Sequence, residues 1–367
     1  MVRGGQETFL MNVMRRIDRE RCRFIFCTPT TEPCDYDEEI LSLGGEIVPC
    51  VFGRSVSRFH ELFRQVLERG GYDVVHAHNY TFAGVVVRAA RRFGIRHRFA
   101  HLHTTGDGQR TTLPRMLYRK LTVHLVRTHA TRVLACSRGA FDAFFGSGRW
   151  EQDGRMNVVY YGVDLPPFEG PVDRQGVRRE LGVSPDDRLM IHVGRFIEAK
   201  NHGGLVDIFR EVRTRRTDIH LVLVGEGELM EQTRARVAQY GLQDGVHFVG
   251  VRSDVPRLMK AADVMVMPSV REGMPVTMIE ATAAGLPIVI TDMPGMREAN
   301  EVCCRATLLP VTEPAARWAD VVIEALDGPR PDFAESLERV RNSPLNSNYA
   351  AEHLMRVYEE TAGADRR

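Results

Sequence analysis

The feature that most constrains the fold is a regular alternation of short apolar runs with longer segments of helical periodicity. The runs are rich in β-branched side chains, and glycine, proline or aspartate separates each run from the segment that follows. Strands that are joined through helices run parallel, and the helices then cover both faces of each sheet. The alternation therefore predicts an α/β fold with doubly wound parallel sheets.

Two series of elements are expected, one in each half of the chain. The strands predicted for the first half are residues 23–28, 46–52, 73–78, 97–104, 132–137 and 157–163. Those predicted for the second half are residues 189–195, 220–225, 246–250, 263–268 and 287–291. The clearest helical segments are residues 58–69, 81–93, 204–215, 228–240, 255–262 and 350–361.

A proline-rich segment divides these two series. Residues 165–171 carry three prolines and a glycine, so they can form neither a strand nor a helix. We therefore expect two Rossmann-like domains, residues 1–165 and 166–345, which face each other across a ligand-binding cleft. Residues 346–367 are expected to form a C-terminal helix that can cross back to the first domain.

Composition excludes several classes of protein. There are 49 Lys and Arg residues against 48 Asp and Glu, and a net charge of +1 argues against a protein that wraps nucleic acid. No apolar run is long enough to cross a bilayer, and the first residues contain no apolar signal sequence. A cytoplasmic protein is expected. Its seven cysteines include no Cys-x-x-Cys pair, so reduced thiols are expected.

The most informative segment follows a predicted buried strand in the second half. Gly273 permits a sharp turn, Pro275 suits the first position of a helix, and Gly285 ends that helix. Glu272 is then expected on a loop and Glu280 about two turns inside the helix. The helix N-terminus suits a phosphate group, and the two glutamates suit the hydroxyl groups of a sugar or a ribose.

A second segment brings cations to the same edge of the predicted sheet. Gly194 and Arg195 end the first strand of the second domain, and Lys200 comes from the loop that follows. Two positive charges and a helix N-terminus can neutralise a diphosphate leaving group without a metal ion. No metal site is predicted, because Asp35 and Asp37 lie far from this half and suit a helix cap better.

Together these residues resemble the retaining GT-B glycosyltransferases of family 4, and most closely their bacterial exopolysaccharide and capsule branch. The resemblance rests on Gly194-Arg195 with Lys200, Val224-Gly225-Glu226-Gly227, Phe248-Val249-Gly250, Pro268, Glu272 with Glu280, Gly4-Gly5-Gln6-Glu7, Asp73-Val74-Val75-His76-Ala77-His78, Ala135-Cys136-Ser137 and Tyr161-Gly162-Val163-Asp164. It implies a GT-B fold, a nucleoside-diphosphate sugar bound by the second domain and an acceptor bound by the first. It also implies transfer with retention of the anomeric configuration.

The resemblance assigns roles to residues by their position. Arg195 and Lys200 would bind the donor diphosphate, Glu272 the sugar hydroxyls and Glu280 the ribose. His103 of the first domain would approach the transferred sugar, so the implied catalytic set is His103, Arg195, Lys200 and Glu272. The remaining donor-binding residues are Gly4 and Gly5 at the β-phosphate, Val251 and Arg252 near the base, and Gly194, Gly273, Met274, Pro275, Val276 and Thr277 at the sugar and phosphates.

Some of these residues have competing interpretations. His101 lies two residues from His103 and competes for its role, and a histidine at the end of a strand is commonly structural. The same holds for His78. Cys303 and Cys304 are adjacent in the sequence and cannot easily bind one zinc ion, so they are expected to be ordinary thiols.

Residues 115–132 form a basic, amphipathic segment that begins with Arg115, Arg119 and Lys120. Such a helix is commonly a solvated surface packed on a sheet. In a chain of net charge +1, a local basic cluster also suits anionic lipid or a lipid diphosphate. On that interpretation the protein lies peripherally on the inner face of the plasma membrane.

The expected function is transfer of a sugar from a nucleoside-diphosphate sugar to a polysaccharide precursor, lipid-linked, with no cofactor. No carboxylate suits a nucleophile for double displacement, so attack on the same face of the sugar is expected. A GT-B nucleotide-sugar epimerase and a non-catalytic nucleotide-sugar binding protein are the alternatives. The chain departs from the family in one respect, because only Met1-Val2-Arg3 precede Gly4 where an apolar strand is normal. We therefore expect either a gap in the sheet of the first domain or a true start of the protein upstream of this sequence.

Overall fold

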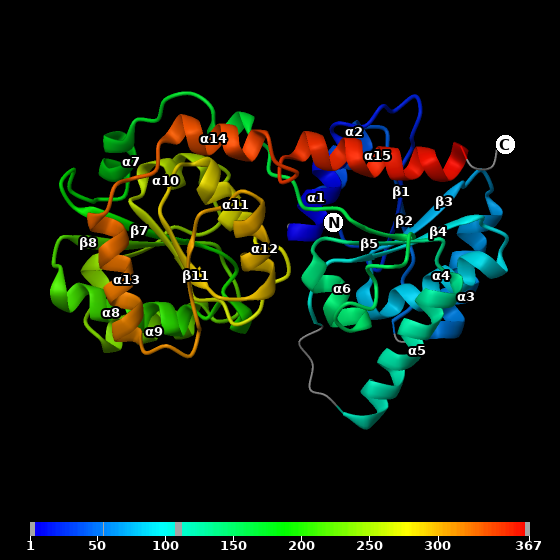
Figure 1. Ribbon diagram of the computed structural model, residues 1–367, viewed down its shortest axis with the longest axis horizontal. Coiled ribbons are helices and arrows are strands. Elements are labelled where there is room, and N and C mark those ends of the chain that lie inside the picture. Colours follow the sequence, from blue (N-terminus) through cyan, green and yellow to red (C-terminus); the bar gives the residue numbers. More distant parts are fainter. Residues whose placement is uncertain (1–3, 54, 107–111, 364–367) are drawn as a thin grey trace. The chain divides into compact units, whose positions relative to one another are not determined.

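The computed structural model describes residues 4–53, 55–106 and 112–363, and the chain divides into two compact units (Figure 1). Unit 1 comprises residues 1–162 and 347–367, and unit 2 comprises residues 163–346. The chain therefore leaves unit 1 just before the proline-rich segment and returns to it for the last helix. Among the described residues, no helix combines the length and the apolar composition that crossing a membrane requires.

Unit 2 contains one sheet of six strands in the order β12-β11-β10-β7-β8-β9. The strands are β7 (Arg188–Val193), β8 (Ile219–Val224), β9 (Val246–Phe248), β10 (Val264–Met267), β11 (Ile288–Thr291) and β12 (Thr307–Leu309). Every neighbouring pair runs parallel. The order of the strands reverses between β7 and β10, which makes this pair the switch point of a doubly wound sheet.

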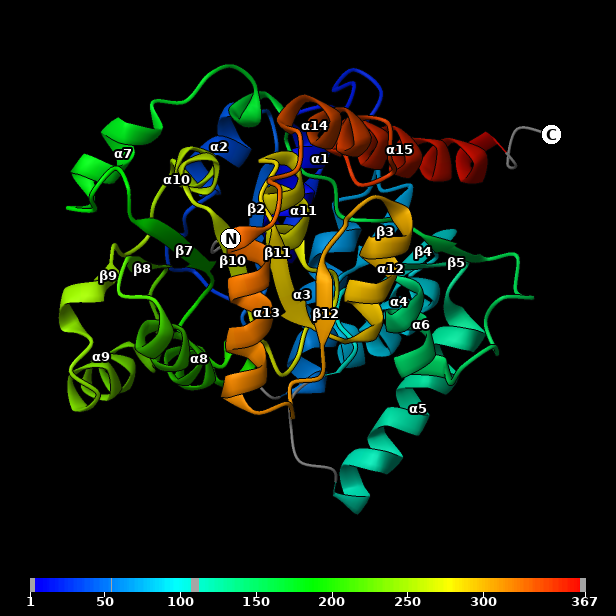
Figure 2. The same cartoon turned by 60° about the vertical axis from the view of Figure 1, so that its left-hand side comes forward.

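Helices cover both faces of this sheet, as the alternation predicted. They are α7 (Arg174–Glu180), α8 (His202–Arg215), α9 (Met230–Gln239), α10 (Val255–Ala261), α11 (Val276–Ala283), α12 (Pro294–Val302), α13 (Ala315–Asp327) and α14 (Phe333–Arg341). Helices α8, α9 and α13 lie on one face, and α7, α10, α11 and α14 lie on the other (Figure 1, Figure 2). A buried apolar core that includes Phe209, Leu221, Val266 and Trp318 packs between helices and sheet.

The five strands predicted for this unit are confirmed, with ends that differ by a few residues. The prediction missed β12, because a three-residue strand at the edge of a sheet is too short to show a period.

The described strands of unit 1 form two sheets instead of one. The pair β1 (Ile25–Thr28) and β2 (Glu46–Pro49) makes one sheet, and β3 (Val74–Ala77), β4 (His97–Leu102), β5 (Arg132–Ala135) and β6 (Met156–Val158) make the other. No described strand joins β1 to β3. The helices of the unit are α1 (Gly5–Met14), α2 (Asp37–Ser42), α3 (Val56–Glu68), α4 (Ala83–Arg92), α5 (Leu113–His129), α6 (Arg138–Phe145) and α15 (Ser347–Gly363).

Helix α15 links the two sheets of unit 1. The hydroxyl of Tyr358 lies 2.7 Å from Nδ1 of His76 on β3. The Tyr358 ring stacks on Phe99 of β4 at 5.5 Å between centroids, and its edge meets Phe24, just before β1, at 6.3 Å. One side chain of the last helix therefore contacts both sheets, which share no backbone ladder.

Candidate active site

The carboxyl ends of β7 and β10 carry an ion pair. Lys200 follows β7 and Glu272 follows β10, and the Nζ of Lys200 lies 2.5 Å from Oε1 of Glu272. The hydroxyl of Ser269 donates to the same carboxylate oxygen at 3.1 Å. The lysine and glutamate side chains are only 18% and 14% exposed. These strands form the switch point of the sheet, the position at which α/β proteins generally bind ligands.

A second carboxyl group lies near this pair. Glu280 is half-buried on α11, and burial raises the pKa of its carboxyl to about 7, although the positive charge of Lys200 opposes the shift. Near neutral pH this carboxyl can therefore hold a proton or release it, so it can donate or accept a hydrogen bond. Hydroxyl groups of a ligand can use both modes.

Glycines at the strand ends let these loops approach one another. A Cβ atom at Gly194 would lie 3.2 Å from Cδ and Cε of Lys200, so the missing side chain leaves room for the lysine stem above the end of β7. A Cβ atom at Gly225, where φ is +131°, would overlap the carbonyl oxygen of Gly194. Arg195, next to Gly194, is exposed. The structure therefore brings predicted residues Gly194, Arg195 and Lys200 to one edge of the sheet.

The predicted segment from Gly273 to Thr277 forms the turn into α11. Met274 is 5% exposed, Pro275 is the N-cap residue, and Val276 begins the helix. A Cβ atom at Gly295, near the start of α12, would overlap the carbonyl oxygen of Gly273, so the two loops pack tightly. Since Met274 points into the protein, the main chain is the part of this segment that a ligand can reach.

In unit 1, predicted residue His103 belongs to a chain of hydrogen bonds. It lies just after the end of β4, where its Nε2 is 2.7 Å from Nδ1 of His78 and its Nδ1 is 2.5 Å from the Tyr161 hydroxyl. His101 stacks on His103 at 4.1 Å between ring centroids. The histidines that the sequence offered as competitors are thus neighbours in one cluster.

The predicted residues Gly4 and Gly5 lie at the start of α1 in the same unit. Gly4 is the N-cap residue and Gly5 begins the helix. A Cβ atom at Gly5 would lie 3.6 Å from the ring of Tyr161, which is the partner of His103. Tyr161 therefore lies close both to the main chain at Gly5 and to the imidazole of His103.

Comparison with known proteins now decides the family. Residues 3–166 match the family model described as Glycosyltransferase Family 4, and residues 173–342 match the one described as Glycosyl transferases group 1. The chain is 34% identical to EpsF of Bacillus subtilis, which carries a glycosyltransferase assignment, over 100% of this chain and 96% of that protein. This chain belongs to the family 4 glycosyltransferases.

Solved structures agree with this family in their fold. A crystal structure of HepE from Anabaena in complex with UDP superposes with a TM-score of 0.80 at 20% identity, covering 97% of this chain and 96% of the other. WaaG, a glycosyltransferase involved in lipopolysaccharide biosynthesis, gives a TM-score of 0.68 at 17% identity and covers 99% and 95%. The predicted GT-B fold is confirmed.

The two residues predicted to contact the base, Val251 and Arg252, differ in their exposure and in their contacts. Val251 is 60% exposed. The guanidinium of Arg252 donates to Asp254 and to Glu180, both at 2.7 Å. Because these carboxylates occupy Arg252, the main chain and Val251 are the available parts of the segment.

The predicted basic segment forms α5, which turns one face to α4 and exposes the other. Thr122, Leu125 and Val126 are buried. The exposed apolar residues are Leu113, Met116, Leu117, Tyr118 and Leu121. The sequence analysis recognised the basic residues of this helix but not its exposed leucines, although their helical spacing was the available signal.

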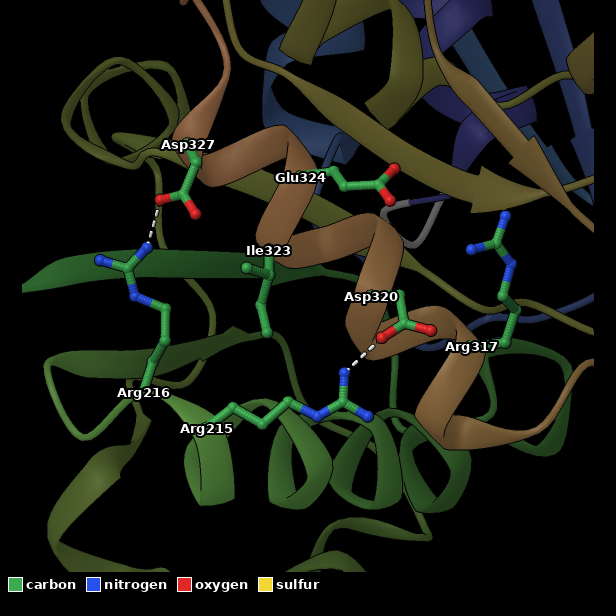
Figure 3. Close-up of a pocket in the computed structure, with 7 residues that line it drawn as sticks. All are labelled: Arg215, Arg216, Arg317, Asp320, Ile323, Glu324 and Asp327. Carbon is green, nitrogen blue, oxygen red and sulfur yellow. Dashed lines mark hydrogen bonds and ion pairs between the residues drawn. The ribbon is translucent and has the colours of Figure 1, made fainter.

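Figure 3 shows a different hollow of the glycosyltransferase, on α8 and α13 of unit 2. Its lining residues are Arg215, Arg216, Arg317, Asp320, Ile323, Glu324 and Asp327. Arg215 pairs with Asp320, and Arg216 pairs with Asp327. The charges of this hollow largely compensate one another, and none of the predicted site residues lines it, so we do not place the active site there.

Proposed function

We propose that this glycosyltransferase transfers a sugar from a nucleoside-diphosphate sugar to a polysaccharide precursor, with retention of configuration and without a metal ion at the diphosphate. The observation that carries the proposal is the Lys200–Glu272 pair beside Glu280 at the switch point of unit 2. Crystal structures of HepE contain UDP and UDP-glucose, which supports a nucleotide-sugar donor for this chain as well.

In the proposed reaction, charged residues of unit 2 act on the leaving group. The bond between the anomeric carbon and the phosphate oxygen breaks, and negative charge builds on the diphosphate. Arg195, Lys200 and the N-terminus of α11 stabilise that charge, since preorganised positive groups act most strongly where charge develops. The acceptor hydroxyl attacks from the same face and passes its proton to the departing phosphate oxygen.

The two carboxyl groups bind hydroxyls in this scheme. Glu272 accepts from hydroxyls of the transferred sugar, and its bond to Lys200 holds it in place at the edge of the sheet. Glu280 contacts the ribose, where a carboxyl with a pKa of about 7 suits a pair of hydroxyls. In unit 1, His103 approaches the transferred sugar.

The experiment follows the anomeric proton by NMR during transfer to a lipid-linked acceptor in the presence of EDTA. We expect a product with the donor's anomeric configuration, formed at a rate that added Mg²⁺ or Mn²⁺ does not raise. An inverted product overturns retention. A rate abolished by EDTA and restored by Mg²⁺ or Mn²⁺ overturns the metal-free diphosphate site. Conversion of the donor to an isomer without acceptor identifies an epimerase, and donor binding without any conversion identifies a binding protein.

We further propose that the acceptor is lipid-linked and that α5 docks on an anionic membrane. A relative from Escherichia coli, 27% identical over 63% of this chain, is named for a diphosphoundecaprenol acceptor. Leu117 and Leu121 of α5 are 59% and 52% exposed, and Lys120 is exposed between them. Exposed leucines beside basic residues are typical of helices that lie in the interface of a membrane.

Sedimentation with anionic vesicles tests this docking. Replacing both Leu117 and Leu121 with aspartate should abolish binding, because each leucine loses the burial of its side chain and gains a repelled charge. Lys120→Glu should weaken it less, since one basic residue near such a surface contributes about 1 kcal/mol. Leu41→Asp on α2, at a leucine that is also 59% exposed, is the matched control and should sediment normally. Unchanged sedimentation of the double variant would mean that α5 is a solvated surface and does not dock on the membrane.

A further inference from the structure

Strands β3 and β4 bring several histidines to one face of the unit 1 sheet. The parallel register pairs His76 with Phe99 and Ala77 with Ala100. Since side chains alternate between the faces of a strand, His76, His78, His101 and His103 all project from the same face. The rings of His76 and His101 stack at 5.2 Å between centroids, and those of His76 and His78 lie 4.1 Å apart.

Three of these rings have nitrogen atoms close to one another. His76, His78 and His101 each offer a ring nitrogen, and the three atoms all lie within 4.8 Å of one another. His101 is completely buried, and neither of its ring nitrogens has a hydrogen-bond partner among the described residues. The Nε2 of His76 is also buried without a partner in that part of the chain. A buried polar atom without a partner destabilises a fold. A bound ion that receives the lone pairs of these nitrogens would remove that cost.

Two of the rings make a hydrogen bond through Nδ1, and one tautomer of each leaves Nε2 available. Nδ1 of His76 is bonded to the Tyr358 hydroxyl at 2.7 Å, and Nδ1 of His78 is bonded to Nε2 of His103 at 2.7 Å. If each Nδ1 carries the proton and donates it, both Nε2 atoms keep a free lone pair. Metal-binding histidines are held in the same manner, with the second ring nitrogen donating to a neighbouring group.

We propose that His76, His78 and His101 bind one divalent transition-metal ion, Zn²⁺ in the first instance. Neutral imidazoles suit Zn²⁺, Cu²⁺, Co²⁺ and Ni²⁺, whereas Mg²⁺ and Ca²⁺ require oxygen ligands. Bonds of about 2.0 Å to a tetrahedral Zn²⁺ would bring the nitrogens to ~3.3 Å from one another. The nitrogens now lie within 4.8 Å of one another, so the stacked rings of His76 and His101 would turn toward the ion as it binds. Water or a nearby side chain completes the fourth position.

An aromatic side chain of α1 borders the three rings. Phe9 makes an edge-to-face contact with His101 at 5.7 Å between ring centroids.

This ion would be structural, and it would lie in unit 1. It would tie β3 to β4 and, through the hydrogen bonds of the ligands, hold Tyr358 of α15 and the proposed catalytic residue His103. The proposed chemistry at the diphosphate in unit 2 needs no metal ion, so the two proposals are independent. A chelator effect that only Zn²⁺ reverses belongs to this site, whereas one that Mg²⁺ reverses belongs to the diphosphate.

The test measures metal binding directly, on the full chain without a histidine tag. After incubation with one equivalent of Zn²⁺ and gel filtration, elemental analysis should find one ion per wild-type chain. Co²⁺ in its place should give intense visible absorption bands, as a four-coordinate nitrogen site does. His101→Phe, which keeps an aromatic ring in the core, should lose the ion and the bands. His124→Gln, at an exposed histidine of α5, is the matched control and should keep both.

Further variants keep the proposal falsifiable. Tyr358→Phe retains the ring but removes the hydrogen bond to His76, and it should weaken Zn²⁺ binding by roughly 10- to 100-fold. If His101→Phe does not fold, His78→Gln at a half-buried ligand replaces it. Wild-type protein that retains no Zn²⁺ and develops no Co²⁺ bands overturns the site, as does equal binding by the wild type and a folded ligand variant.

Discussion

The strand ends of unit 2 carry charged side chains that pair with one another, whereas the sheet of unit 1 carries uncharged imidazoles that stack. In unit 2 the Lys200–Glu272 pair lies at the carboxyl edge, beside a half-buried Glu280. In unit 1 the four clustered histidines project from the face of the sheet, and burial removes their charge. Two units built on the same parallel α/β plan thus offer different chemistry, one suited to an anion and its hydroxyls and the other to a soft cation.

The sheets of the two units also differ in how their strands are joined. The six strands of unit 2 form one continuous ladder, whereas the six described strands of unit 1 are split between two ladders. In unit 2 backbone pairing joins each strand to the next across the whole sheet. In unit 1 side chains of α15 supply part of that connection, and Tyr358 contacts both sheets. The difference predicts that single side chains matter more to the stability of unit 1.

The largest expected effect tests this contrast. Tyr358→Ala removes an almost completely buried ring that links the two sheets, and loss of a large aromatic side chain from a core costs about 3 to 5 kcal/mol. Calorimetry should show the transition of unit 1 shifted to lower temperature and that of unit 2 unchanged. Tyr349→Ala, on the same helix but 41% exposed, is the control and should shift neither transition appreciably. Equal shifts of both transitions by Tyr358→Ala would contradict the separate role of α15.

The next effect concerns catalysis in unit 2. Arg195→Ala and Lys200→Ala should each lower kcat on the order of 10²-fold, since losing one preorganised contact to developing charge costs about 3 kcal/mol. The donor Kd should change less, because the charge on the diphosphate is largest in the transition state. Steady-state kinetics and calorimetric titration measure the two quantities. Arg305→Ala, at an exposed arginine of the same unit, should change neither.

A double-mutant cycle refines this prediction. Because Glu272 is bonded to Lys200, Lys200→Ala also leaves a mostly buried carboxylate without its cation. Adding Glu272→Gln to Lys200→Ala should therefore restore part of the lost stability but none of the lost rate. Full recovery of kcat in the double variant would mean that Lys200 only neutralises Glu272 and does not act on the diphosphate.

The contrast between the units also explains what sequence could predict. In unit 2 each candidate residue follows a strand within a short segment, and parallel strands end at a common edge, so Lys200 and Glu272 could be placed together before their contact was known. Their direct ion pair could not be predicted, because it depends on how the loops turn. The hydrogen bonds of Arg252 to Glu180 and Asp254 could not be predicted either, because they also depend on the folded loops.

In unit 1 the sequence shows the histidines, but only the register of the strands shows that they lie together. Two His-x-His pairs, residues 76–78 and 101–103, stand at the ends of predicted strands. Alternation alone puts each pair on one face of its strand, but only the register of β3 against β4 shows that both pairs share a face and come into contact. His101 and His103, which the sequence offered as alternatives for one role, stack on each other in the structure.

The smallest expected effect is on the pH dependence of stability and concerns Glu280, the half-buried acid of unit 2. Unlike the neutral histidines of unit 1, this group becomes charged near neutral pH. Burial raises the pKa of Glu280 to about 7 from an ordinary value of 4.5. Between those two values the folded protein holds a proton that the unfolded chain has released, so the free energy of unfolding falls as pH rises from 4.5 to 7 and is level on either side. The full shift would correspond to about 3 kcal/mol, and the solvent contact of this half-buried group reduces our expectation to about 1 to 2 kcal/mol.

Glu280→Gln separates this destabilising charge from its use in donor binding. The variant should raise the free energy of unfolding of unit 2 by about 1 to 2 kcal/mol at pH 8 and leave it unchanged at pH 4, because the charge it removes exists only in the first case. Glu324→Gln, on the exposed face of α13, is the control and should show no such dependence on pH. The same Glu280 variant should weaken donor binding at pH 8 roughly tenfold, since hydrogen bonds from hydroxyls to a charged acceptor are stronger than those to an amide. A stabilised variant with reduced donor affinity would show that the Glu280 carboxylate destabilises unit 2 but binds the donor. A stabilised variant with full donor affinity would show that Glu280 does not contact the donor, and Glu272 would then be the acid that contacts the hydroxyls.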